Sequence, residues 1–315
     1  MRLSAAARGA RRDRPAARGL FAPGVWFQAV RPFSLTAAAV PVLAGTALAA
    51  DEAFHPGLFV LALLGSMAFQ AGTNLINDYY DYVFGVDTSL SLGPSGVIQR
   101  GLLPPFAVLV AGLVAFALGV AFGLTIVAFV GVAVLPLGVA SLLAGYAYTG
   151  PPLKLAYRAL GELTVFVFMG PVIVMGAAYV QLEAWTWEAF LASLPAGLLI
   201  SAILHANNLR DIDGDRAMGK RTLASLVGRP AADVELAVLV LGAYATVIVL
   251  VASGAAPLTG LVALAALPSA LRLLSRLRTS HDARSLNRVL LGTVGAHLLF
   301  GLLWALGFAL DAWTG

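Results

Sequence analysis

Two clusters of asparagine and aspartate interrupt a sequence that is otherwise largely apolar. The first polar cluster holds Asn74, Asn77, Asp78, Asp81 and Asp87. The second polar cluster holds Asn207, Asn208, Asp211, Asp213 and Asp215, and Lys220 and Arg221 follow it closely. Carboxylate and phosphate oxygens are ligands that magnesium prefers, and nearby ammonium and guanidinium groups bind phosphate. The two clusters therefore predict a site for magnesium and a diphosphate.

The spacing within each cluster predicts that its side chains share one face of a helix. The i, i+3, i+4, i+7 pattern describes Asn74, Asn77, Asp78 and Asp81, and it recurs at Asn208, Asp211 and Asp215. Asp213 falls outside this stripe and is expected to face solvent, whereas Asp87 follows Gly85, where the helix is expected to break. A single acid near a helix end usually caps the helix or pairs with an arginine. Two matched clusters favour binding of a metal and a diphosphate over that interpretation.

The composition indicates the class of protein. The chain has 315 residues, of which 60% are hydrophobic and 11% charged, and its mean hydropathy is +0.88. Soluble domains contain about 25% charged residues. Repeated apolar stretches of spanning length therefore predict an all-α protein that crosses the membrane several times. The absence of cysteine excludes disulfides, thiolate metal sites and cysteine nucleophiles.

Hydropathy predicts about nine membrane-spanning helices. They cover approximately residues 32–50, 57–77, 104–122, 128–148, 161–181, 188–209, 234–253, 257–275 and 288–310. Residues 1–22 lack the apolar core that a secretory signal requires. They are expected to form a disordered basic tail. Residues 23–315 are expected to form a single intramembrane domain.

The basic residues predict the orientation in the membrane. All 20 Lys and Arg lie in the tail, at the entry to the first predicted span, or near the connections after the second, fourth, sixth and eighth. The remaining connections carry only acids. The positive-inside rule then predicts a cytoplasmic N-terminus, an outside C-terminus and two polar clusters that end helices on the cytoplasmic side. The clusters are expected to face one another across a central cavity.

Several further residues on this side are candidates for substrate contacts. Lys154, Arg158 and Arg100 are expected to bind the diphosphate, with a purely topological role as the alternative. Arg31 opens the first predicted span and is a candidate for the diphosphate or for an acceptor carboxylate; snorkelling to the interface is the alternative. His205 lies inside the sixth predicted span, where a hydrogen-bonded interior histidine is favoured over contact with substrate.

Both clusters resemble the motifs of the UbiA-type intramembrane prenyltransferases. The resemblance rests on Asn77-x-x-x-Asp81-x-x-x-x-x-Asp87 and Asp211-x-x-x-Asp215, and it covers the chain from about Arg31 onward. The more common first motif of that superfamily has its last aspartate after a three-residue gap, where this chain has Gly85. The longer gap resembles the dihydroxynaphthoate prenyltransferase branch. The same is true of Arg31-Pro32, Tyr148-Thr149-Gly150-Pro151, Gly161-Glu162-Leu163 and Asn207-Asn208-x-Arg210-Asp211. Gly219-Lys220-Arg221-Thr222-Leu223-Ala224 matches that branch closely.

The resemblance implies nine helices around a central cavity and Mg²⁺-dependent transfer of a prenyl group from a polyprenyl diphosphate to an aromatic acceptor. The implied acceptor is 1,4-dihydroxy-2-naphthoate, in menaquinone biosynthesis at the inner (cytoplasmic) membrane. Metal ligands are expected at Asp78, Asp81, Asp87, Asp211 and Asp215, of which the last four are also the expected catalytic residues. Contacts to substrate are expected from Asn74, Asn77, Asn208 and Tyr148.

Other functions remain open at this point. A different phenolic acceptor, such as 4-hydroxybenzoate or homogentisate, would suit the same motifs. Membrane CDP-alcohol phosphotransferases concentrate their aspartates in one stretch, whereas this chain has two clusters four predicted helices apart. Cation transporters usually bind their ions near the bilayer midplane, whereas these acids lie at one mouth. The lipid bilayer is an expected partner, and nucleic acid is not.

Overall fold

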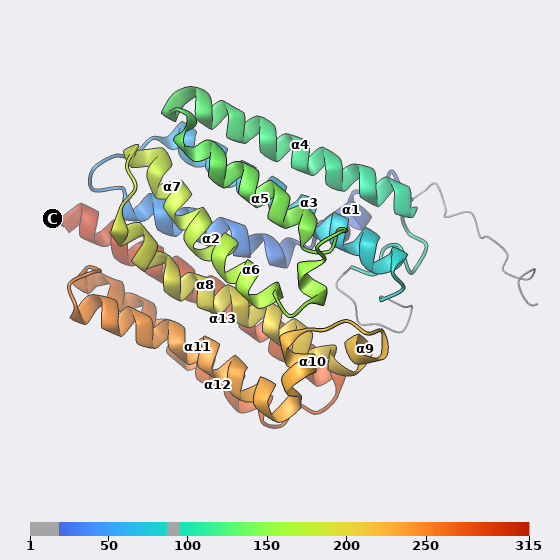
Figure 1. The fold of residues 1–315 in the computed structure, drawn as a ribbon. Helices are drawn as coiled ribbons and strands as arrows, with labels where there is room; N and C mark the ends of the chain where they lie inside the picture. Colours follow the sequence, from blue (N-terminus) through green and yellow to red (C-terminus); the bar gives the residue numbers. More distant parts are fainter. Residues whose placement is uncertain (1–18, 87–94, 315) are drawn as a thin grey trace, which may run out of the picture.

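The computed structural model describes residues 19–86 and 95–314, and every regular element in these ranges is a helix (Figure 1). The long elements are α2 (Pro32–Leu48), α3 (Pro56–Val83), α4 (Pro105–Val130), α5 (Leu135–Ala147), α7 (Ile173–Leu182), α8 (Trp187–Arg210), α11 (Arg229–Ala252), α12 (Leu267–Leu277) and α13 (Ala283–Thr314). Shorter elements are α1 (Pro23–Val30), η3 (Val132–Val134), η4 (Leu155–Tyr157), α6 (Gly161–Val167), η5 (Phe168–Val172), α9 (Ile212–Ala217), α10 (Leu223–Val227) and η6 (Leu258–Ala266). Most of the predicted tail, residues 1–22, lies outside the described ranges, and so does Asp87.

The chain is a multi-pass membrane protein by the length and composition of its helices. Within the described residues, seven helical stretches could cross a membrane, or eight if α1 and α2, bent by 56° relative to each other, form one span. The prediction of nine spans is therefore confirmed only in part. The predicted span at 128–148 corresponds to the shorter apolar stretch Val132–Ala147, because α4 continues to Val130 and is followed by Gly131, which has a φ of 82°.

The span Gly161–Leu182 contains a local widening of the helix. Its two α-helical parts, α6 and α7, are joined by the π-helical segment η5, which includes Pro171. A proline lacks the backbone N–H that a regular helix requires, and a π-bulge is one way to accommodate such a residue. Close packing supports this bend, because a Cβ on Gly170 would lie 2.9 Å from the Cα of Gly197 in α8.

Glycines allow α3 and α4 to lie close together. A Cβ on Gly72 of α3 would lie 2.4 Å from the ring of Phe116, and a Cβ on Gly119 of α4 would lie 2.7 Å from the ring of Phe69. These two rings pack edge to face across the helix pair. Small residues at the contact therefore fix the position of α3, which carries the first polar cluster.

The second polar cluster begins in the most buried of the candidate spans. In α8, 67% of an 18-residue apolar stretch is buried inside the protein, and the helix packs against α11 and α13. Trp304 of α13 anchors this contact by donating a hydrogen bond of 3.0 Å to the carbonyl of Ala192. The short helices α1, α9 and α10 gather at one end of the bundle, and the C-terminus lies at the other (Figure 1). Both clusters lie toward the end that bears the short helices.

Candidate active site

A cavity of about 1140 Å³ opens between the helices and brings the two polar clusters together. Asn74, Asn77 and Asp81 line it from the first cluster, and Asn207, Asn208, Asp211, Asp213 and Asp215 line it from the second. The lining also follows α3 from Asp81 back to Ala62. These residues are about 28 Å apart along a helix that rises about 1.5 Å per residue. The cavity is therefore elongated, with carboxylates concentrated at one end.

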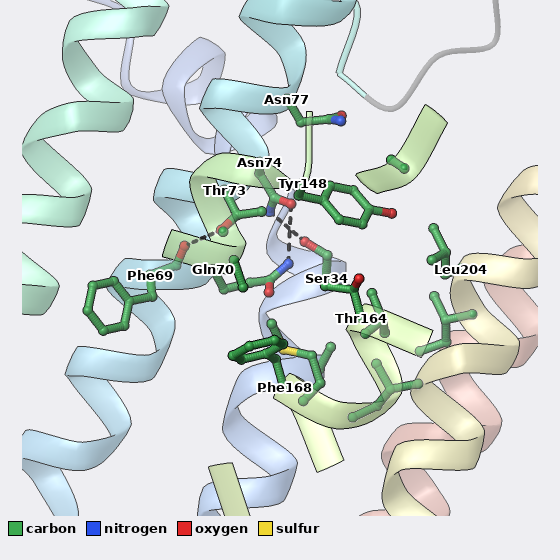
Figure 2. A pocket seen from close by; sticks show the side chains of 18 of the residues that line it. Ser34, Phe69, Gln70, Thr73, Asn74, Asn77, Tyr148, Thr164, Phe168 and Leu204 are labelled. Atoms are coloured by element: carbon green, nitrogen blue, oxygen red, sulfur yellow. Dashed lines mark hydrogen bonds between the residues drawn. The ribbon is translucent and has the colours of Figure 1, made fainter. Parts of the chain in front are cut away.

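The rest of the cavity lining is mostly apolar. It includes Leu124, Val127, Leu137, Phe168, Met169 and Val172, which come from α4, α5 and η5. In Figure 2, Phe168 lies below Gln70, Thr73 and Asn74, and Tyr148 lies above Phe168. Leu204 lies at the right of the view, across from Gln70 and Thr73. The π-helical segment thus supplies apolar side chains directly beneath the polar end. An elongated apolar arm joined to an acidic end suits a ligand with a hydrocarbon chain and a charged head.

Asp81 is buried at this acidic end and accepts a hydrogen bond from the hydroxyl of Tyr157. Tyr157 belongs to the loop between α5 and α6, and that loop is docked against the segment after α9. The Ala159 amide donates to the Arg221 carbonyl at 2.7 Å, and the Arg221 amide donates to the Tyr157 carbonyl at 3.3 Å. Lys220 lies 5.4 Å above the Tyr157 ring. The two loops together therefore place an aromatic hydroxyl and a cation beside Asp81.

Asp215 lies in α9 and has one oxygen in an ion pair. Its Oδ1 is 3.4 Å from Lys220 Nζ, whereas its Oδ2 is buried with no hydrogen-bond partner among the described residues. Burial raises the pKa of Asp215 to about 6. This value already includes the opposing charge of Lys220 and the charges of Asp211 and Asp81, which add to the effect of burial. The carboxylates thus repel one another across the cavity, and a bound cation would relieve that repulsion.

The second cluster does not form one continuous helical stripe, as its spacing predicts. Helix α8 ends at Arg210, Asp211 has a φ of −102° and a ψ of 9°, and α9 begins at Ile212. Arg210 stabilises this junction by holding both Asp211 oxygens, at 2.7 and 2.5 Å. The same guanidinium donates to the Asn207 and Asn287 side chains, each at 2.9 Å. Asp213, which the spacing places off the stripe, is exposed in the structure.

Asp78 is engaged in a buried ion pair away from the cavity lining. Its carboxylate accepts from the guanidinium of Arg31 and from the hydroxyl of Ser95, and both Asp78 and Arg31 are buried. Arg31 also donates to Asn77 Oδ1 at 3.3 Å and lines the cavity. Because both Asp78 oxygens have partners, this aspartate is less available to a metal than Asp81 or Asp215.

The remaining predicted contacts divide into two groups. Asn74 and Tyr148 line the cavity, and Asn74 donates to Ser34 at 2.7 Å (Figure 2). Asn74 also donates to the Val30 carbonyl at 2.8 Å. The three predicted cations Lys154, Arg158 and Arg100 do not line the cavity. Lys154 Nζ lies 3.4 Å from the centroid of the Phe84 ring. Arg158 donates to the Pro152 carbonyl at 3.3 Å and Arg100 to the Ser95 carbonyl at 2.8 Å.

Sequence reasoning missed two partners of the acidic residues, Tyr157 and Ser95. Tyr157 lies between Lys154 and Arg158, which were predicted to contact substrate, and this position could have identified it as a candidate. Ser95 lies in a connection that shows no helical or motif pattern. Their roles depend on how loops dock, which spacing along the chain does not reveal.

The donor set suits magnesium bound together with phosphate. Among the described residues, no three His, Cys, Asp or Glu side chains gather closely enough to form a metal cage by themselves. Magnesium usually takes one or two carboxylates and fills its other positions with water and substrate phosphates. Asp81 and Asp215, the second of which has an unpartnered buried oxygen, fit this type of site.

Comparison with known sequences gives one consistent result. The model of the UbiA prenyltransferase family matches residues 38–300. A protein of Bacillus subtilis (strain 168) named 1,4-dihydroxy-2-naphthoate octaprenyltransferase is 33% identical over 288 residues, which cover 91% of this chain and 93% of that protein. The protein of the same name from Mycobacterium tuberculosis (strain ATCC 25618 / H37Rv) is 35% identical, over 90% of this chain and 95% of that protein.

Two solved structures illustrate the shared fold. The structure of a UbiA homologue from Archaeoglobus fulgidus bound to GPP and Mg²⁺ superposes with a TM-score of 0.66 at 18% identity, over 90% of this chain and 98% of that one. The apo structure of a UbiA homologue from Aeropyrum pernix K1 gives a TM-score of 0.64 at 15% identity, over 88% and 97%. At these identities the likeness shows the fold.

Proposed function

This chain belongs to the UbiA prenyltransferase family, and from that premise we propose that it transfers a polyprenyl group from an allylic diphosphate to 1,4-dihydroxy-2-naphthoate. The observation that carries the proposal is the elongated cavity, whose acidic end joins an apolar arm. The diphosphate would bind at the acidic end, and the prenyl chain would extend along the apolar lining of α3, α4 and η5.

We propose Mg²⁺ as the cofactor, held between the two polar clusters by Asp81 and Asp215. The A. fulgidus homologue of this fold was solved with GPP and Mg²⁺. Mg²⁺ would neutralise the charge that develops on the departing diphosphate. Asp211 lines the cavity too, but Arg210 holds both of its oxygens, so Asp211 would act mainly through its negative charge. Asp87 stays a predicted ligand that lies outside the described residues.

The residues of the chain have separate tasks in the proposed reaction. Lys220 lines the cavity beside Asp215 and would bind phosphate oxygens directly. Tyr157 would orient Asp81 through its hydrogen bond. The bond between the allylic carbon and the diphosphate oxygen breaks, and diphosphate leaves with the electron pair. An electron-rich ring carbon of the acceptor forms the new bond to the prenyl group, and the acceptor carboxylate leaves as CO2, which restores the aromatic ring. The buried, largely apolar walls exclude water, which would otherwise capture the prenyl cation.

The identity of the acceptor rests on the branch-like motifs and on the relatives' names. The B. subtilis and M. tuberculosis relatives are both named for dihydroxynaphthoate, at 33% and 35% identity. An anionic acceptor requires a cation near the reacting groups. Arg31 lines the cavity, whereas Arg100 and Lys154 do not, so Arg31 is the better candidate for the acceptor carboxylate.

We also propose that the protein resides in the cytoplasmic membrane with this site on the cytoplasmic side. The support comes from the arginines and lysines, which concentrate in the tail and near the connections that follow even-numbered predicted spans. Both polar clusters belong to that same side of the predicted topology.

A competition between acceptors tests the proposal. Purified protein would receive one radiolabelled donor, geranylgeranyl diphosphate, and either dihydroxynaphthoate, 4-hydroxybenzoate or homogentisate. We expect the highest kcat/KM for dihydroxynaphthoate and no product in excess chelator. A preference for either single-ring acceptor would contradict the proposed acceptor and leave prenyl transfer in place. Turnover in excess chelator would contradict the proposed cofactor.

A further inference from the structure

A buried hydrogen-bonded unit lies behind the cavity, where α6, α8 and α11 meet. It consists of Glu162, His205 and Asn208, all of which are buried. Glu162 Oε1 accepts a hydrogen bond of 2.9 Å from Asn208 Nδ2 and lies 3.3 Å from His205 Nδ1. Of the three residues, only Asn208 lines the cavity. Burying a carboxylate and an imidazole inside a membrane protein is costly, which indicates a functional reason for their presence.

His205 determines whether Glu162 Oε1 donates or accepts in its hydrogen bond with Asn208. His205 Nε2 lies 2.9 Å from the Ala232 carbonyl, and a carbonyl can only accept, so the Nε2 hydrogen is used there. The remaining proton of the pair then lies between His205 Nδ1 and Glu162 Oε1, on one atom or the other. Glu235 Oε1, at 3.8 Å from Nδ1, is too far away to take that hydrogen bond.

This arrangement fixes the orientation of the Asn208 amide. Wherever the shared proton resides, it points along the line between His205 and Glu162. Glu162 Oε1 can therefore only accept a hydrogen bond from Asn208, and Asn208 must donate that bond from Nδ2. The side-chain oxygen of Asn208 is directed the other way, and no hydrogen bond to it is found among the described residues. An outward oxygen is an acceptor, which suits a cation or a metal-bound water rather than a phosphate oxygen.

We propose that Glu162, with His205 behind it, is a positioning residue that directs the Asn208 oxygen toward the Mg²⁺ of the active site. The proposal rests on the proposed function, since it needs a metal at the acidic end of the cavity. Hydrogen-bond partners of this kind commonly change metal affinity by about 10- to 100-fold when they are removed. Glu162 lies at the start of the span Gly161–Leu182.

The decisive variant is Glu162→Gln, which keeps the size of the side chain. A neutral His205 that donates to Ala232 has an acceptor at Nδ1, so the glutamine would turn its NH2 group toward it. That same NH2 group would then face Asn208, and Asn208 would flip to present its oxygen inward and its NH2 group to the cavity. We expect the apparent Kd for Mg²⁺ to rise by about 10- to 100-fold. The measurement is a Mg²⁺ titration by thermal shift, with the unreactive analogue farnesyl S-thiolodiphosphate present.

A second substitution should reverse this loss. In the double variant Glu162→Gln and Asn208→Asp, the aspartate accepts from the glutamine with one oxygen and presents its other oxygen to the cavity. We expect the Mg²⁺ affinity of the double variant to return to within about threefold of wild type, since an oxygen again faces the metal. A role limited to helix packing predicts no such rescue.

Ser201→Ala is the matched control. Ser201 Oγ donates to the Glu162 backbone carbonyl at 3.1 Å, so this variant removes a buried hydrogen bond between the same two helices without touching the Asn208 amide. We expect its Mg²⁺ affinity to match wild type. Equal losses in Ser201→Ala and Glu162→Gln, or wild-type affinity in Glu162→Gln, would overturn the proposal.

The outcomes also separate this proposal from the proposed function. If wild type itself shows no Mg²⁺-dependent stabilisation by the thiolodiphosphate, the metal site and the positioning role both fail. If wild type responds and Glu162→Gln responds equally, only the positioning role fails. If Glu162→Gln is not recovered folded, Asn208→Ala decides, because it leaves the Glu162–His205 pair intact. Wild-type Mg²⁺ affinity in that variant would overturn the proposal, and a loss of about 10-fold or more would support it.

Discussion

The Tyr157 hydroxyl donates a hydrogen bond to the Asp81 carboxylate, joining the loop between α5 and α6 to the end of α3. The bond crosses 76 positions of sequence. Its geometry depends on the docking of the Tyr157 loop against Arg221. Tyr157 thereby restricts the orientation of the Asp81 carboxylate toward a bound metal or diphosphate.

Tyr157→Phe should lower kcat/KM by about 10- to 100-fold, which is the range for losing a hydrogen bond to a charged group. The ring remains, so its edge contact with Phe84 should persist. The control is Tyr146→Phe, which removes the 2.9 Å hydroxyl contact with Tyr80 at the same end of the bundle. A steady-state assay on both variants is the measurement. Equal losses would show that the effect of Tyr157→Phe is not specific to its hydrogen bond with Asp81.

Charge at Asp81 and Asp215 should be essential to the proposed metal site. Asp81→Asn and Asp215→Asn keep the size of each side chain and remove its charge, so each should lower kcat by at least about 100-fold. Asp213→Asn should change kcat by less than about threefold, because Asp213 is exposed and forms no ion pair among the described residues. Single-turnover assays on the three variants test this. A loss at Asp213 equal to that at Asp215 would mean that α9 presents a different face to the metal.

The buried pair of Arg31 and Asp78 should contribute to stability rather than to metal binding. Arg31→Ala would leave the Asp78 carboxylate buried without its cation, at a cost of about 3–5 kcal/mol in the free energy of unfolding. Adding Asp78→Asn should recover part of that loss, since the remaining buried group is then neutral. Denaturation in detergent micelles gives both values. Asp78→Asn alone should still bind Mg²⁺, and a loss of that binding would restore Asp78 as a metal ligand.

Much of the fold could be predicted from the sequence because membrane spans obey a simple length and composition rule. The predicted span at 188–209 corresponds closely to α8, and that at 161–181 to Gly161–Leu182. At 128–148 the structure has a shorter apolar helical stretch, Val132–Ala147, because Gly131 adopts a positive φ and divides the apolar run. Hydropathy carries no information on such a backbone turn, and so the predicted span begins too early.

The site was predictable where it depends on spacing and unpredictable where it depends on docked loops. Asn74, Asn77 and Asp81 line the cavity as their helical spacing predicts, because one helix carries all three. Asp78 shares that spacing but is held by Arg31 and Ser95, which come from separate segments. Lys154 is positively charged and belongs to the predicted cytoplasmic side, but its ammonium group lies over the Phe84 ring. Pairings between distant segments require the tertiary structure.

The raised pKa of Asp215 predicts opposite effects of pH on the metal-free and the metal-bound protein. Burial is the main cause, the charges of Asp211 and Asp81 add to it, and Lys220 opposes it. Because the folded-state pKa, about 6, exceeds the ordinary 3.8, the protonated form stabilises the metal-free fold. That contribution is fully present below about pH 3.8 and is lost as the pH rises through about 6.

Magnesium needs the ionised carboxylate, so a proton competes with it at Asp215. The apparent Kd for Mg²⁺ should therefore be nearly constant above about pH 7 and should rise by up to about 10-fold for each pH unit below about 6. Titrations of wild type with farnesyl S-thiolodiphosphate at several pH values give this slope, and Asp213→Asn should reproduce it. In the metal-free protein, Asp215→Asn should abolish the fall in Tm that Asp215 causes between pH 5 and 7. A Kd that is independent of pH in wild type would show that Asp215 does not exchange a proton for the metal.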